Sequence, residues 1–65
     1  MTNHEKLILY LVQDKVSFMM ENNCDNNYIA LYIDDVIAKL SSSYSWELFS
    51  TLYRMQDNLI YGNEF

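Results

Sequence analysis

The sequence contains no proline and a single glycine among its 65 residues, so it has few of the residues that form turns and flexible linkers. Hydrophobic residues make up 51% of it, including ten aromatic ones (six Tyr, three Phe and one Trp), a composition rich in packing groups. Neither disorder nor a division into several domains fits this composition and length. We therefore expect one ordered domain over residues 1–65.

The sequence also lacks the usual means of stabilising a very small fold. With Cys24 as its single cysteine it can form no internal disulfide, and with His4 as its single histidine it has no zinc-ligand spacing. A core formed by 65 residues contributes only about 3–5 kcal/mol by itself. Association with another chain is the remaining source of stability, and the sequence favours it.

Positive charge is scarce, because nine acidic residues face four basic ones and give a net charge of −5. This balance repels nucleic-acid backbones and argues against direct binding of DNA or RNA.

No apolar run approaches the length of a membrane span, and the N-terminal residues lack the pattern of a signal peptide. We therefore expect a cytoplasmic protein. The abundance of Tyr, Asn and Ile is typical of AT-rich coding sequence and favours a bacterial, phage or plasmid origin.

Three helices account for the hydrophobic pattern. Thr2 and Glu5 form a capping-box pattern that opens a helix over about residues 3–21. Asp25 or Asn26 caps a second helix over about residues 26–41. A serine-rich connector precedes a third helix over about residues 45–61, which Gly62 ends. The fold class predicted is all-α, a small three-helix bundle completed by homodimerisation.

The second helix has one competing interpretation. Residues 28–33, Tyr-Ile-Ala-Leu-Tyr-Ile, also suit a buried strand, because Tyr and Ile favour strands. The apolar pattern continues in helical register through Val36, Ile37 and Leu40, and no second strand is present to pair with it. Helix is therefore the better prediction.

The first and third helices carry more apolar surface than a small bundle needs. On the third helix an aliphatic stripe lies beside an aromatic one, and on the first helix a second apolar arc adjoins the core arc. Close three-helix packing could bury this surplus, or it could close on another chain. We favour the second alternative, with an identical copy or a different protein as the partner. The candidate interface residues are Leu7, Leu11, Phe18, Trp46, Phe49, Tyr53 and Ile60.

The polar stretch around residues 20–28 resembles a site but fails each test. Counted from Asp25, a calcium loop would need a glycine at Ala30 and a glutamate at Val36. His4 and Cys24 lie at opposite ends of the first helix, about 30 Å apart at 1.5 Å per residue. We expect no cofactor, no metal and no enzymatic activity. For Cys24, an intermolecular disulfide or a redox role stays open beside a structural one.

Three functions follow from these exclusions. The first is a small acidic regulator or inhibitor that docks an apolar, aromatic helix face on a larger protein. The second is mimicry of DNA, with the acidic surface of Asp34, Asp35 and Glu47 imitating phosphates. The third is a helix-turn-helix regulator, suggested only by three short helices and opposed by a third helix with the single basic residue Arg54. The first is our prediction.

Overall fold

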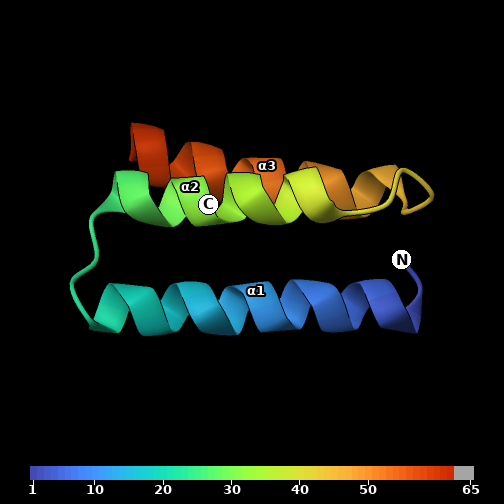
Figure 1. The fold of residues 1–65 in the computed structure, drawn as a ribbon, viewed down its shortest axis with the longest axis horizontal. Helices are drawn as coiled ribbons and strands as arrows, with labels where there is room; N and C mark the ends of the chain where they lie inside the picture. Colours follow the sequence, from blue (N-terminus) through green and yellow to red (C-terminus); the bar gives the residue numbers. More distant parts are fainter. Residues whose placement is uncertain (63–65) are drawn as a thin grey trace.

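The computed structural model describes residues 1–62, and these residues form three helices: α1 (Asn3–Glu21), α2 (Asn26–Lys39) and α3 (Trp46–Tyr61). The helices run alternately up, down and up, so that α1 and α3 point the same way (Figure 1). The predicted all-α, three-helix fold is thus confirmed. Dimerisation remains a prediction.

The caps that begin the helices explain where each helix starts. The Thr2 hydroxyl accepts the Glu5 backbone N–H at 3.1 Å, and the Thr2 backbone N–H donates to Glu5 Oε1 at 2.9 Å, so the predicted capping box is present. Asp25 caps α2 by accepting the Asn27 N–H at 3.2 Å. Ser45 is the N-cap of α3, but its side chain makes no capping bond.

The turn between α1 and α2 is a Schellman motif. The Asn23 N–H donates to the Met20 carbonyl and the Cys24 N–H donates to the Met19 carbonyl, both at 3.0 Å. Asn23 takes the left-handed conformation, with φ of 58°, that this motif requires. Cys24 follows at the position where the motif favours an apolar residue, and it packs against the core. The asparagine-rich stretch therefore forms the end of α1 and the turn into α2.

The second helix ends at Lys39, two residues before the predicted end. Leu40 is extended, with φ of −75° and ψ of 143°, although its side chain still packs against the core. The Ser41 hydroxyl accepts the Ser43 N–H at 3.2 Å, which offers the backbone an alternative to another helical turn. The predicted helix was two residues too long because the apolar pattern continues through Leu40, whereas the hydrogen bond of Ser41 favours a turn there.

The core lies between all three helices. Ile29, Ile33, Leu48 and Leu52 are fully buried, so the centre belongs to α2 and α3. These two helices pack against each other more extensively than either packs against α1. The other buried apolar residues are Val12, Val16, Met19, Ala30 and Leu59.

Candidate functional site

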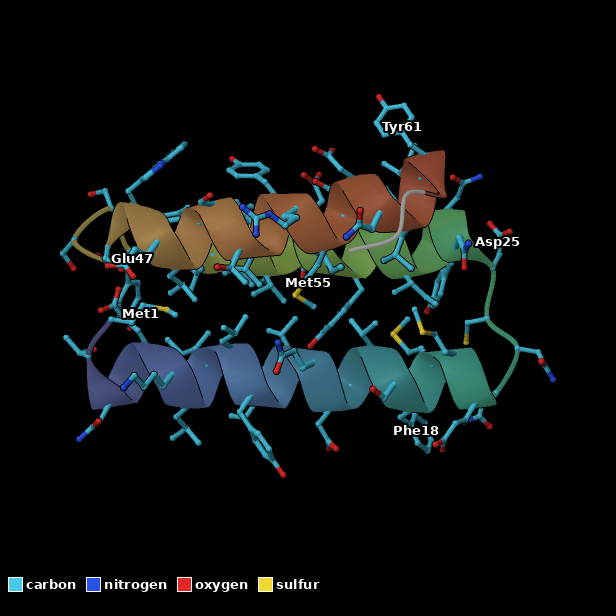
Figure 2. All side chains as sticks on the ribbon, turned by 180° about the vertical axis from the view of Figure 1, so that it is seen from behind. Met1, Phe18, Asp25, Glu47, Met55 and Tyr61 are labelled. Atoms are coloured by element: carbon cyan, nitrogen blue, oxygen red, sulfur yellow. The ribbon has the colours of Figure 1, made fainter. Side chains whose placement is uncertain are left out.

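The outer face of α1 carries three large apolar side chains in one line. Leu7, Leu11 and Phe18 are spaced by four and seven residues, which at about 100° per residue places them within a narrow arc. Their exposed fractions are 53%, 56% and 57%. Phe18 points away from α2 and α3 (Figure 2). These residues, called the α1 stripe below, belong to no part of the described core.

A second line of apolar side chains follows α3. Trp46, Tyr53 and Ile60 recur every seven residues and are 75%, 44% and 48% exposed. Phe49, the fourth residue of the predicted aromatic stripe, is half-buried. This set is called the α3 stripe below. The structure thus places six of the seven predicted interface residues on the surface, on two separate helix faces.

The three predicted acidic residues lie on two helices. Asp34 and Asp35 are exposed neighbours on α2, whereas Glu47 lies in the first turn of α3. Asp35 pairs with Lys39 at 2.9 Å, and Glu47 lies 3.6 Å from the N-terminal ammonium of Met1. Two of the three charges are therefore partly neutralised by neighbours.

Glu5 is the one buried charged residue in the described part of the chain, and sequence reasoning gave it only a capping role. While Oε1 accepts the Thr2 N–H, Oε2 accepts the Ser45 backbone N–H at 2.6 Å. Hydrogen bonds from Thr2 and from Ser45 lower the pKa of Glu5 from 4.5 to about 2. One carboxylate therefore joins the N-termini of α1 and α3. The position of Glu5 on the apolar arc of α1 was the sequence feature that could have indicated its burial.

A second contact strengthens the same corner of the bundle. His4 Nε2 and the Tyr44 hydroxyl are 3.0 Å apart, and the two rings stack with centroids 5.8 Å apart. With the bond between Glu5 and Ser45, this contact holds the start of α1 against the segment that leads into α3.

The opposite ends of α1 and α3 flank a groove. An open groove of about 600 Å³ lies between their C-terminal halves. Asn58 lines it and carries a buried amide nitrogen for which the described residues supply no acceptor. The other lining residues are Gln13, Val16, Ser17, Met20, Asn26, Met55, Leu59 and Gly62.

The described residues contain no group of three His, Cys, Asp or Glu side chains placed to hold a metal ion. Cys24 is a free, half-buried thiol. Among residues 1–62, no helix combines the length and apolar character that crossing a membrane requires. The two stripes and the groove are candidates for recognition of another molecule, and other large apolar side chains, such as Tyr28, Leu31 and Tyr61, are also exposed.

Comparison with known proteins adds no relative to these observations. No family model matches the chain. No curated protein and no solved structure matches it at a significant level.

Proposed function

We propose that the chain is a small acidic regulator or inhibitor that binds a larger protein through an exposed apolar helix face. The observation that carries this proposal is the α1 stripe, in which Leu7, Leu11 and Phe18 each expose more than half of their surface. Isolated exposed apolar residues are ordinary, but an aligned set on one helix is typical of a docking surface.

The geometry of α1 suits insertion into a groove on the partner. An amphipathic helix that binds in this way presents anchors on one face, separated by three, four or seven residues. Leu7, Leu11 and Phe18 have this spacing, and the charged residues Asp14 and Lys15 lie beside them. The apolar anchors supply affinity, while the net charge of −5 would speed the encounter with a basic partner surface.

Homodimerisation is the finer part of the proposal. The chain is short, residues 1–62 include nine buried apolar side chains, and a second apolar face on α3 is exposed. Domains of this size gain little stability from their own core, so burying such a face in a second copy supports the fold as well as the function.

The two alternative functions have less support. DNA mimicry requires carboxylates that stand free, whereas Asp35 and Glu47 have positively charged neighbours. A helix-turn-helix reader requires a basic recognition helix, and Arg54 is the single basic residue of α3. Neither alternative uses the exposed apolar side chains.

The test is affinity capture from the source cells with a charge-matched pair of variants. Leu11→Glu combined with Phe18→Glu should abolish capture of the partner while the circular dichroism spectrum stays helical, because both residues lie outside the core. Lys6→Glu changes the net charge by the same two units at an exposed position of α1 outside both the stripe and the groove, and it should retain capture. Equal capture by the stripe variant and by Lys6→Glu would refute the proposal.

A further inference from the structure

We propose that a second copy of the chain covers the α3 stripe, with the two α3 helices antiparallel and Tyr53 on the two-fold axis. This inference rests on the proposed protein-binding function, and it assigns one of the two exposed faces to one partner. The α1 stripe then stays free for a different protein.

The spacing of the α3 stripe is self-complementary in an antiparallel arrangement. Trp46 lies seven residues before Tyr53 and Ile60 lies seven residues after it. A two-fold axis at Tyr53 therefore places each Trp46 opposite the Ile60 of the other copy, so that the largest side chain meets a smaller one. In a two-fold interface each such contact occurs twice. A repeat of seven residues is also the spacing at which two long helices stay in contact.

The polar edge of the stripe agrees with the same axis. Ser50 lies three residues before Tyr53 and Asp57 lies four residues after it, and both lie on the same side of the stripe. Antiparallel pairing therefore brings the Ser50 hydroxyl of one copy beside the Asp57 carboxylate of the other, where it can donate a hydrogen bond. The two Asp57 residues stay about 12 Å apart along the direction of the helix axes, at 1.5 Å per residue. Parallel pairing would instead set them side by side.

The exposed area of the α3 stripe approaches the lower size limit of a specific interface. Fully buried aromatic side chains each contribute roughly 150–250 Å². With Trp46 75% and Tyr53 44% exposed, these two residues alone offer roughly 250 Å² per copy. Ile60, the exposed part of Phe49 and the polar edge bring the total toward the roughly 500 Å² per partner at which specific interfaces begin.

The α1 stripe is a poorer site for a second copy. Positions three and four residues apart run through Leu7, Leu11, Asp14 and Phe18, so a carboxylate lies on this line, as Asp57 does at the polar edge of the α3 stripe. Asp57 has Ser50 seven residues before it, whereas the residue seven positions before Asp14 is Leu7, which offers no hydrogen bond. Pairing two copies along this line would bury two Asp14 side chains that the stripe itself does not neutralise, which costs free energy. A partner that supplies a basic residue opposite Asp14 removes that cost. The two faces thus suit different partners.

Site-directed disulfide cross-linking tests the register. In a Cys24→Ser background, Tyr53→Cys should form a covalent dimer under mild oxidation, because residues on the axis bring their Cα atoms within disulfide range. Trp46→Cys alone should form no covalent dimer, while an equal mixture of the Trp46→Cys and Ile60→Cys chains should cross-link. Arg54→Cys, exposed and adjacent to Tyr53 but outside the stripe, is the matched control and should not cross-link.

Cross-linking of Trp46→Cys to itself would overturn the antiparallel arrangement, and absence of a Tyr53→Cys dimer would overturn the two-fold position. Sedimentation of the unmodified chain gives an independent measurement, in which Tyr53→Glu should raise the dimer dissociation constant at least about tenfold. A monomeric wild-type chain would refute the inference while leaving partner capture through the α1 stripe untouched. Failure of that capture with an intact dimer would refute the proposed function alone.

Discussion

At the scale of single residues, Glu5 stabilises the N-terminal ends of two helices. Its carboxylate accepts hydrogen bonds at the N-terminus of α1 and at the N-cap of α3, and these bonds lower its pKa to about 2. In the unfolded chain the group takes up a proton near its ordinary value of 4.5. Its contribution to stability is therefore complete above pH 4.5 and is lost as the pH falls from 4.5 toward 2.

Glu5→Gln should accordingly destabilise the protein at pH 7 and leave the stability at pH 2 nearly unchanged. Urea denaturation followed by circular dichroism at several pH values measures the difference. Glu21→Gln, which changes an exposed carboxylate in the last turn of the same helix, is the control and should lose little at either pH. A Glu5→Gln penalty that is the same at pH 2 and pH 7 would contradict the role assigned to the charge.

The core residues offer a second test at this scale. Leu52 is fully buried and Leu31 is 66% exposed, so the same Leu→Ala change probes two environments. Leu52→Ala should cost about 2–5 kcal/mol of unfolding free energy, because it leaves a cavity, whereas Leu31→Ala should stay within about 0.5 kcal/mol. For a fold this small the first change is large enough to leave much of the chain unfolded at room temperature. Similar losses for both would mean that the core is placed wrongly.

At the scale of helices and turns, Asn23 carries the strain of the α1–α2 connection. Its φ of 58° is accessible to asparagine and glycine but unfavourable for alanine. Asn23→Ala should therefore cost about 1–2 kcal/mol, while Asn23→Gly should be close to neutral. Thermal unfolding of the two variants provides the comparison. A stable alanine variant would show that the turn does not require this conformation.

Local signals in the sequence were sufficient to locate all three helices. The capping box at Thr2 and the stop at Gly62 depend on neighbours within a few residues, and both lie where they were predicted. The N-cap of α2 is Asp25, one of the two residues predicted for it. The early end of α2 was missed, because the apolar side chain of Leu40 fits both a helix and an extended residue that still reaches the core.

Features that depend on distant residues were harder to predict. The bond from Ser45 to Glu5 joins residues 40 positions apart. The place of Glu5 on the apolar arc of α1 indicates burial, but nothing near either residue indicates which group it would bind. The exposed stripes were predictable in part. The helical period grouped their residues, but only the packing of α1, α2 and α3 showed which faces stay on the surface.

At the scale of the whole molecule, a dimer formed by two acidic chains should respond to concentration and salt in a defined way. The unfolding midpoint should rise with protein concentration, since association stabilises the folded state by mass action. The affinity of the two copies, each with a net charge of −5, should increase with salt, because salt screens their repulsion. Sedimentation at low and high salt measures this effect. Weaker association at high salt would indicate an interface held by charge instead of apolar contact.

The carboxylate of Glu5 also has a consequence for the order in which the chain folds. The bond to Ser45 closes a loop of about 40 residues, and closing it costs less entropy once α2 and α3 have paired and shortened the path between its ends. We therefore expect α1 to dock after the transition state. Glu5→Gln should then accelerate unfolding and leave the folding rate almost unchanged in stopped-flow experiments, so α1 would be the last of the three helices to join the bundle.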